Sequence, residues 1–421
     1  MKILTKLRNI AIARKATLLV LTLAIALALT LVATPAATAQ TYSVIHTFTG
    51  GQGGAQPSGG VTLRGGVLYG TAEYGGYNNN GLIYQLTRGS WNFSSIFLFP
   101  GDGSGGVAPL SGVLFAPDGH FYGTIAANDP YYVIFYDLLP PVSVCKTANC
   151  GWKQNILDTF GKEHGLDPQN GKLVWDQQGN AYGITKGGGS FGFGTVFELT
   201  KSGNNWSQSP IYSFSGGNDG WSPLNGVFLD NHGNLFGTTY LGGSAGEGVI
   251  FELTFVPGVG WKQIVIHTVA GGSEGESPVA GVIGDSSGNL YGSTLGGGSG
   301  GGGTIFELSP SGNTWTYKVL YSFSGAGGPV HNLNMDAAGN LYGATVSDGA
   351  YGKGNVFKLT HTPNGWVYTS LYDFTGGSDG SNPLTDVAID SDGTLYGTAN
   401  IGGDTSCNPP NGCGVVWMIK P

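Results

Sequence analysis

A tetrapeptide, LYGT or a close variant, occurs seven times along the chain and constrains the possible fold more than any other feature. Each unit between two copies holds four short runs rich in β-branched and aromatic residues, as residues 222–269 illustrate. Four antiparallel strands in about 50 residues make one blade of a β-propeller. The sequence therefore predicts an all-β, seven-bladed β-propeller of four-stranded antiparallel blades, with repeats of 51–60 residues. The repeat aromatics are Tyr69, Tyr122, Tyr182, Phe236, Tyr291, Tyr342 and Tyr396.

The two ends of the repeat region complement each other. The last unit contains only three strand-like runs, and the missing fourth-strand pattern stands at 42–48. One N-terminal strand and three C-terminal strands would complete the last blade and remove the free edges of an open array. An open β-solenoid, the alternative, would need polar capping repeats at both ends. We therefore expect a propeller closed by its own first strand.

The turns of the repeat have a consistent chemistry. Six residues before five of the repeat aromatics stands an Asp, with Gly three residues after it. Because Asp binds the backbone of a following turn and Gly accepts its left-handed position, this pattern predicts a tight turn. A structural calcium loop is a weaker alternative, since only Asp390 has a second nearby carboxylate, Asp392. The five residues are Asp176, Asp230, Asp285, Asp336 and Asp390.

The fourth run of most units contains a Trp and, eight residues later, a Phe, as in Trp315 and Phe323. We interpret both as packing residues between blades, because a repeat needs the same filler each time. Stacking of these Trp residues on sugars is the alternative.

The first 39 residues differ from the rest. Five basic residues precede or flank the start of an apolar run at 17–33, and Ala37 and Ala39 fit a cleavage site before Gln40. We expect 1–39 to be a signal peptide and 40–421 a single propeller domain, an uncleaved anchor being the alternative. The protein would then be exported, to the periplasm or the medium, with no membrane span in the mature chain, and we expect a monomer.

Charge and cysteine content fit export. After removal of 1–39 the chain has 13 basic and 26 acidic residues, which disfavours nucleic acids and anionic lipid surfaces as partners. The four cysteines form two local pairs, each in a long loop. Two disulfides, Cys145–Cys150 and Cys407–Cys413, are favoured over a four-Cys zinc site, because the pairs belong to non-adjacent blades.

The motifs LYGTTxxGG, GTVFELT, LYSFSGGxDGxxP and DxxGNLYGT recur, with good copies at 230–243 and 285–325. At this level the chain closely resembles the GloVer (Gloeobacter/Verrucomicrobia) tandem-repeat proteins over nearly all of 42–419. The resemblance implies a bacterial source and an extracytoplasmic location. It implies no activity, because that family is defined by its repeat.

Glycine-rich loops supply the candidate ligand-binding residues. In a propeller the loops between strands two and three and those leading to the next blade share one face, and acidic and aromatic side chains there could bind a glycan or a divalent cation. Solvation of ordinary surface carboxylates is the alternative. The candidates are Asp219, Trp221, Tyr240, Glu274, Glu276 and Asp379, with Tyr74 and Tyr77 nearby.

A second set lies eleven residues before the repeat aromatics, where strand one should enter the central channel. Only His331 is titratable in this ring, and a lone His is more often structural than catalytic. The ring consists of Ser58, Ser111, Asn225, Ala280, His331 and Thr385, with Asn170 the equivalent in the third blade. A metal-dependent lactonase would need Glu, Asp and Asn ligands there, and a glycosidase would need paired carboxylates.

Two functional hypotheses follow. The first is an exported, non-catalytic binding or structural module whose partner is a glycan, an envelope component or an envelope protein. The second is a secreted carbohydrate-active hydrolase or lyase that uses carboxylates or His331. We prefer the first, and we predict no catalytic residues, no metal ligands and no cofactor, since no motif for nucleophilic, metal or nucleotide chemistry is present.

Overall fold

The computed structural model describes residues 40–100, 106–109, 111–116, 118–127, 132–141, 151–167, 172–203, 205–325 and 327–421. The chain divides into two compact units, Met1–Thr41 with Pro421, and Tyr42–Lys420. The strands described below belong to the second unit, apart from Thr41, the first residue of β1.

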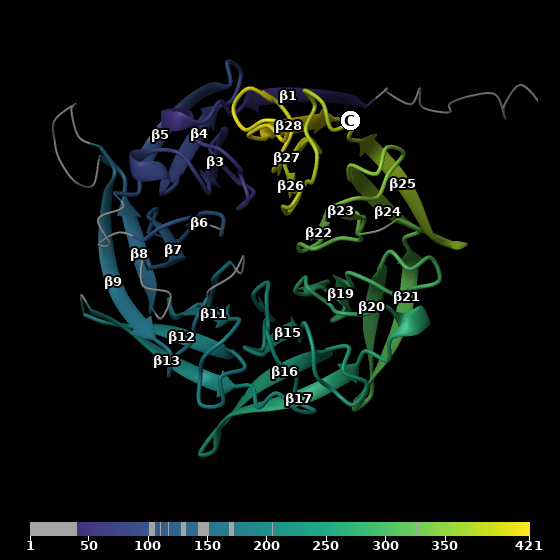
Figure 1. Cartoon of the computed structure of the whole chain (residues 1–421). Helices are drawn as coiled ribbons and strands as arrows, with labels where there is room; N and C mark the ends of the chain where they lie inside the picture. Colours follow the sequence, from purple (N-terminus) through teal and green to yellow (C-terminus); the bar gives the residue numbers. More distant parts are fainter. Residues whose placement is uncertain are drawn as a thin grey trace, which may run out of the picture. The chain divides into compact units, whose positions relative to one another are not determined.

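Within these ranges, seven four-stranded sheets surround a common centre (Figure 1). The chain is therefore a seven-bladed β-propeller, as the repeat predicts. Blade 1 contains β2 (Val61–Arg64), β3 (Val67–Ala72), β4 (Leu82–Thr87) and β5 (Asn92–Leu98). Blade 2 contains β6 (Leu114–Phe115), β7 (Phe121–Ala126), β8 (Tyr132–Leu139) and β9 (Lys153–Gly161). Blade 3 contains β10 (Val174–Trp175), β11 (Ala181–Thr185), β12 (Thr195–Ser202) and β13 (Asn205–Ser213).

The remaining blades follow the same order. Blade 4 contains β14 (Phe228–Leu229), β15 (Leu235–Thr239), β16 (Val249–Val256) and β17 (Gly260–Thr268), and blade 5 contains β18 (Ile283–Gly284), β19 (Leu290–Ser293), β20 (Thr304–Ser311) and β21 (Thr314–Ser322). Blade 6 contains β22 (Asn334–Met335), β23 (Leu341–Thr345), β24 (Asn355–Thr362) and β25 (Gly365–Asp373). Three short 3-10 turns occupy Gly51–Gly53, Tyr77–Asn79 and Gly272–Glu274 of the described chain.

Blade 7 combines the two ends of the repeat region. Its strand order is β1 (Thr41–Thr47), β28 (Val415–Lys420), β27 (Leu395–Ala399) and β26 (Ala388–Ile389). Figure 1 shows β1 as the outermost strand of this sheet, beside β28. The Phe48 N–H also donates to the Gly414 carbonyl at 3.0 Å, just beyond the paired strands.

The core lies between neighbouring blades. Just after the outermost strand of five blades a Phe is fully buried, and Val269 fills the same place in blade 4; the five are Phe48, Phe99, Phe214, Phe323 and Phe374. The Trp eight residues earlier contacts the repeat aromatic of the preceding blade: Trp315 lies 6.0 Å from Phe236 and Trp366 lies 5.9 Å from Tyr291, ring centre to ring centre. This confirms the interpretation of the Trp–Phe spacing as packing between blades.

The Asp–Gly turns form as predicted. In the turn between β18 and β19, the Asp285 carboxylate accepts the N–H groups of Ser287 and Asn289 at 2.8 and 2.9 Å. Gly288 follows with φ of +83°, a conformation that favours Gly over residues with a Cβ. The two carboxylates proposed for calcium, Asp390 and Asp392, instead accept hydrogen bonds from the Arg88 guanidinium at 2.6 and 2.7 Å.

Cys407 and Cys413 form a disulfide in the loop between β27 and β28, with their Cα atoms 5.8 Å apart. This pairing was predicted. Cys145 and Cys150 lie outside the described residues.

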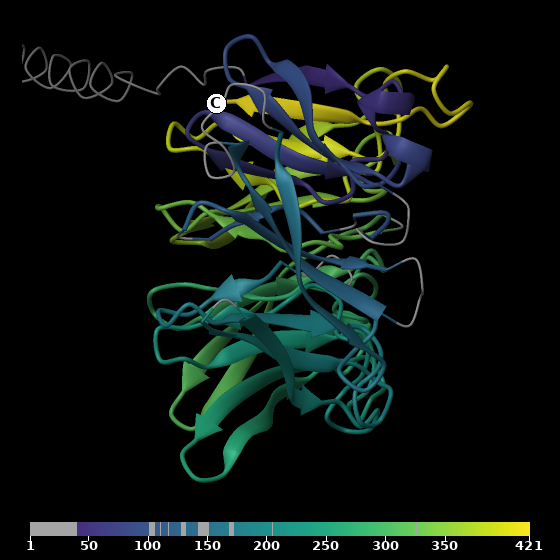
Figure 2. The ribbon, with the colours of Figure 1, turned by 90° about the vertical axis from the view of Figure 1, so that its left-hand side faces the viewer.

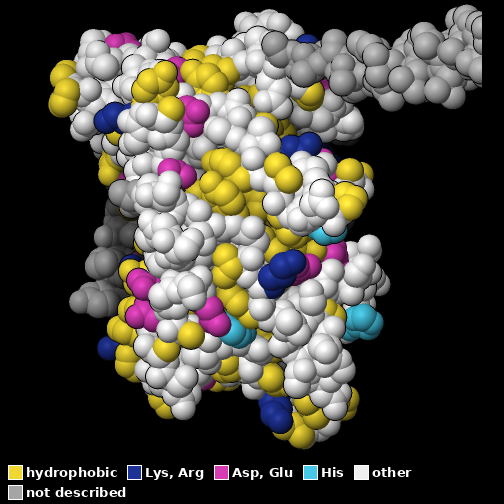
Figure 3. Space-filling model, turned by 90° about the vertical axis from the view of Figure 1, so that its right-hand side faces the viewer, with side chains coloured by type: hydrophobic (Ala, Val, Ile, Leu, Met, Phe, Trp, Pro, Cys, Tyr) yellow, Lys and Arg dark blue, Asp and Glu magenta, His cyan; other side chains and the backbone are white. Residues whose placement is uncertain are grey.

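The outer wall over β21 and β25 carries few charges. Figure 3 shows mostly uncharged atoms there, with isolated acidic and basic groups, in keeping with a chain of which 10% is charged. Among the described residues, no helix has the length and apolar character needed to cross a membrane.

Candidate functional site

The predicted site lies on two kinds of loop, those between strands two and three and those that lead from strand four to the next blade. Antiparallel neighbours put both kinds at the same end of the sheets. Isolated β-bridges join them, for example Trp221 to Leu241. We call this end the loop face, and the opposite end, with the turns between strands one and two, the turn face. Figure 2 shows the ring from the side, with connections at both ends of the sheets.

Asp219 and Asp379 are bound into their own loops. The Asp219 carboxylate accepts hydrogen bonds from the Ser215 hydroxyl at 2.6 Å, the Ser215 N–H at 2.8 Å and the Tyr212 hydroxyl at 2.9 Å. Asp379 repeats the arrangement with the equivalent threonine and tyrosine. Burial alone would raise the pKa of both carboxyls, but these hydrogen bonds outweigh it and hold the pKa below its ordinary value. Both residues therefore stabilise their loops as anions.

Glu274 takes the equivalent place in the loop before blade 5. It accepts the Ala270 N–H at 3.1 Å and lies 3.1 Å from Nε2 of His267. The imidazole of His267 stacks on Tyr317, with ring centres 4.2 Å apart. Glu276 has one long hydrogen bond, from the Gly272 N–H at 3.4 Å. Of the four predicted carboxylates, Glu276 therefore has the most acceptor capacity left.

Aromatic side chains are exposed on the loop face. Trp221 is half-buried and meets Phe193 edge to face, with ring centres 5.5 Å apart, and Tyr240 is half-buried in the loop that follows β15. Two further exposed residues that sequence reasoning did not select are Phe191, 61% exposed, and Tyr351, 62% exposed. Their signal was an aromatic residue inside a glycine-rich loop, GGGSFGFG or DGAYGKG. Tyr74 and Tyr77 are also exposed, at 36% and 59%.

The residues expected to line a channel are mostly buried against neighbouring backbone. The Ser111 hydroxyl donates to the Thr124 carbonyl at 3.2 Å, and the Asn225 amide donates to the Val330 carbonyl at 2.7 Å. Buried members of this ring are Ser58, Ser111, Asn225, Ala280 and Thr385. Asn170 lies outside the described residues. These small side chains thus secure contacts between strands.

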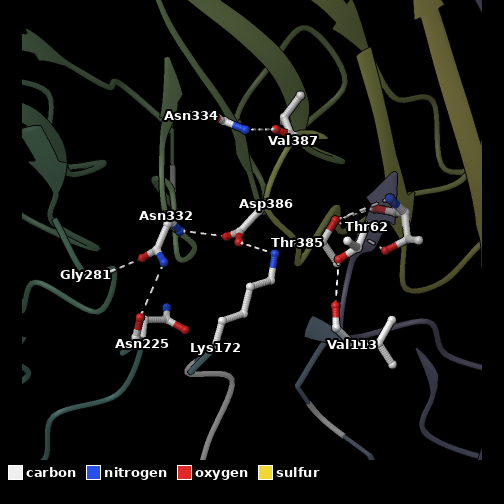
Figure 4. Close-up of polar contacts among 11 residues, drawn as sticks. Thr62, Val113, Lys172, Asn225, Gly281, Asn332, Asn334, Thr385, Asp386 and Val387 are labelled. Atoms are coloured by element: carbon white, nitrogen blue, oxygen red, sulfur yellow. Dashed lines mark hydrogen bonds and ion pairs between the residues drawn. The ribbon is translucent and has the colours of Figure 1, made fainter. Parts of the chain in front are cut away.

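Three polar side chains missed by sequence reasoning meet near the centre of the ring (Figure 4). The Lys172 ammonium lies 2.9 Å from the Asp386 carboxylate, which also accepts the Asn332 N–H at 3.0 Å. The Asn332 side chain accepts the Gly281 N–H at 2.7 Å and donates to the Asn225 carbonyl at 3.4 Å. These contacts join blades 3, 7, 6, 5 and 4. We call Lys172, Asp386 and Asn332 the central network.

The position of the central network did carry a sequence signal. It lies ten residues before the repeat aromatics, where the other blades have Gly59, Gly112, Gly226 and Gly281. Four blades have Gly at this repeat position, whereas the other three have Lys172, Asn332 and Asp386. A cation, an amide and an anion at equivalent positions around one ring indicate side chains that contact each other. Burial would raise the pKa of Asp386, but the Lys172 charge holds it below its ordinary value.

His331, next to Asn332, belongs to the same central region. Its side chain is half-buried and has no hydrogen-bond partner among the described residues. Burial lowers the pKa of His331 to about 4, so the imidazole is neutral at neutral pH. The nearby Asp386 and Lys172 charges act on the pKa of His331 in opposite directions, Asp386 raising it and Lys172 lowering it.

Three depressions lie on the turn face, between neighbouring blades. They have volumes of about 450, 390 and 560 Å³ and lie between blades 3 and 4, 4 and 5, and 5 and 6. The Asp turns form much of their walls. Within the described ranges, no three His, Cys, Asp or Glu side chains are placed together to hold a metal ion.

Two overlapping stretches, 143–264 and 254–421, match the model of the Gloeobacter/Verrucomicrobia repeat. Together they cover more than half of the chain. The chain belongs to this repeat family. The resemblance drawn from the motifs is thereby confirmed.

No curated protein matches the sequence. Among solved structures, an extracellular domain from B. thetaiotaomicron is 9% identical and has a TM-score of 0.50, over 90% of this chain and 40% of that chain. A proposed 6-phosphogluconolactonase from Bacteroides uniformis is 13% identical with a TM-score of 0.48, over 79% and 95% of the two chains. An α-L-arabinanase from Penicillium chrysogenum, in complex with arabinobiose, is 12% identical with a TM-score of 0.45, over 90% and 98%. At 9% identity the likeness to the extracellular domain concerns the fold alone.

Proposed function

We propose that this protein is an exported, non-catalytic binding module that holds a glycan on its loop face. In this proposal 1–39 act as the signal peptide and 40–421 as one propeller domain. The observation that carries the proposal is the set of exposed aromatic side chains on glycine-rich loops, with Phe191 and Tyr351 each more than 60% exposed.

The chemistry of this face suits a sugar. A pyranose ring has an apolar C–H face that stacks on an aromatic ring and a rim of hydroxyl groups that need hydrogen-bond partners. Aromatic side chains provide large rigid contact areas at little entropic cost. Glu276, with its largely unused carboxylate, offers an acceptor on the same face.

The hydrolase alternative has less support. A glycosidase needs a carboxylic acid whose raised pKa lets it donate a proton. At Asp219 and Asp379 the hydrogen bonds hold the pKa down. His331 lies near Asp386 and Lys172 of the central network.

The test is a glycan array and a panel of soluble polysaccharides, applied to the full chain and to Phe191→Ala and Tyr351→Ala, with a reducing-end assay of the same samples. We expect binding without new reducing ends, weakened about tenfold or more in at least one variant, a loss of the order measured for single contact residues. The control is Phe255→Ala, a similarly exposed aromatic residue (57%) near the end of β16, toward the turn face. Equal loss in the control, no binding at all, or product formation would refute the proposal.

A further inference from the structure

The depression between blades 4 and 5, which we call the 4/5 groove, differs from its equivalents in other blades. It has a volume of about 390 Å³, within the range of small-molecule sites. Phe236, Leu290, Pro310 and Trp315 form its apolar walls. Three carboxylates line it, Asp230, Glu252 and Asp285, of which Asp285 already accepts the Tyr291 hydroxyl. The described residues that line it include no Lys or Arg. It lies on the turn face, so it is independent of the glycan surface proposed above.

In blades 3 and 5, a tyrosine hydroxyl joins the two carboxylates that correspond to Asp230 and Glu252. The Tyr182 hydroxyl contacts Asp176 at 3.2 Å and Glu198 at 2.9 Å. In blade 5 the Tyr291 hydroxyl makes the same pair of contacts, at 3.1 and 3.3 Å. A phenol is thus the normal donor between these two acidic positions.

Blade 4 has Phe236 at the tyrosine position, so this donor is missing. Asp230 Oδ2 retains one side-chain amide contact, from Asn234 at 3.1 Å, and the exposed His232 at 3.5 Å. Glu252 has no hydrogen-bond or ion-pair partner among the described residues. Burial, followed by the Asp230 charge, raises the pKa of Glu252. The groove therefore presents unused acceptors beside an aromatic wall.

Some equivalent positions on the turn face are occupied by the protein's own basic side chains, although the described residues that line the depressions between blades 3 and 4 and between blades 5 and 6 also include no Lys or Arg. Between blades 7 and 1, the Arg88 guanidinium binds Asp390, the counterpart of Asp230, at 2.6 Å. Between blades 2 and 3, the Lys201 ammonium lies over the Trp206 ring at 5.5 Å, and in blade 6 the Lys358 ammonium lies 5.5 Å from the Tyr342 ring.

Arg88 and Lys201 stand at the same position of the repeat, four residues after the aromatic of strand three. In blade 5 that position is Pro310, which cannot supply a charge to the 4/5 groove. The 4/5 groove thus keeps the acidic turn and the Trp wall of the cation-filled grooves while lacking both the basic side chain and the phenol.

From these observations we propose that the 4/5 groove binds an organic cation, an alkylguanidinium or alkylammonium group, from outside the chain. The cation donates to Asp230 and Glu252, as the Arg88 guanidinium donates to Asp390. Its alkyl part packs on Trp315 and Phe236, where a cation also gains from the negative face of an aromatic ring.

The test measures binding of n-butylguanidinium to the full chain by ligand-observed NMR, with uncharged n-butylurea of the same shape as the control ligand. A capped Gly-Arg-Gly peptide is run in parallel. Preference for the free cation indicates a small-molecule ligand, and preference for the peptide indicates a basic side chain of a protein; either supports the site.

Three variants change the groove. Phe236→Tyr restores the phenol, Pro310→Arg restores the basic side chain, and Glu252→Gln removes one charge; each should weaken cation binding at least tenfold. The matched control, Glu307→Gln in blade 5, should leave binding unchanged. Thermal unfolding checks that each variant is folded, and Pro310 is an exposed residue near the end of β20, where a substitution is tolerated well. Absence of binding, equal binding of n-butylurea, or full binding by folded Pro310→Arg would overturn the proposal.

Discussion

Hydrogen bonds decide whether a carboxylate of this propeller serves the fold or stays available to a ligand. Asp219 accepts from a hydroxyl and an N–H of its own loop and from the phenol of Tyr212 on β13, and its pKa is held down. Glu252 has lost the phenol that its counterparts use, and its pKa is raised. Acidic residues that look alike in the sequence therefore have different roles, which depend on donors contributed by other positions.

The pH dependence of stability should report this difference. Because the folded-state pKa of Asp219 lies below its unfolded value near 3.9, its contribution to stability is present above that value and is lost as pH falls through the folded pKa. Asp219→Asn should cost about 1 kcal/mol at pH 7, a modest figure because the site is half-exposed, and should flatten the loss of stability between about pH 5 and 2. Thermal unfolding at pH 7 and pH 3 measures both effects. Glu276→Gln is the control, and an Asp219→Asn variant as stable as the wild type at pH 7 would contradict the prediction.

At the scale of the strand, the fourth strands fasten one blade to the next through two aromatic positions. Phe323 is fully buried, whereas Trp315, eight residues earlier, is half-buried and faces the 4/5 groove. The Phe therefore carries most of the packing, and the Trp closes the gap near the turn face. In blade 4 the fully buried Val269 occupies this position, so a smaller apolar residue is tolerated there when the surrounding side chains pack against it.

Truncation of this Phe should be costly. Phe323→Ala should lower the free energy of unfolding by about 3–5 kcal/mol, because it leaves a cavity between blades that neighbouring strands cannot refill. Urea unfolding provides the measurement. Val367→Ala, a half-exposed position on strand four of blade 6, should cost less than about 0.5 kcal/mol. Similar midpoints for the two variants would show that the strand-four Phe is not the anchor.

Features that repeat in every blade could be predicted from the sequence. The Asp285 turn with Gly288, the Trp–Phe spacing of strand four and the four-strand order each depend on contacts within one unit or with its neighbour, and the same signal appears many times. Features confined to one blade could not be predicted in this way. The loss of a hydroxyl at Phe236 has a consequence only because Asp230 and Glu252 face that position, which the linear sequence does not show.

At the scale of the whole ring, the central network connects residues far apart in the sequence. Lys172 in blade 3 and Asp386 in blade 7 lie 2.9 Å apart, with side chains only 28% and 22% exposed. Each replaces a glycine found at this position in other blades. Lys172 and Asp386 can pair only after blades 3 and 7 have assembled into the ring. The strength of this ion pair is therefore a measure of the stability of the whole ring.

A double-mutant cycle tests this role. Lys172→Met should destabilise the protein more than the double variant Lys172→Met/Asp386→Asn, because it leaves a partly buried carboxylate without its cation. The coupling energy should fall between about 1 and 3 kcal/mol, measured from urea unfolding of the four proteins. The equivalent cycle for the exposed pair Arg88 and Asp392, whose side chains are 41% and 47% exposed, should give less than about 1 kcal/mol. If the Lys172 and Asp386 effects are additive, the central ion pair does not couple the blades. A larger coupling at the centre than at the rim would mean that the ring is held together across its middle as well as around its circumference.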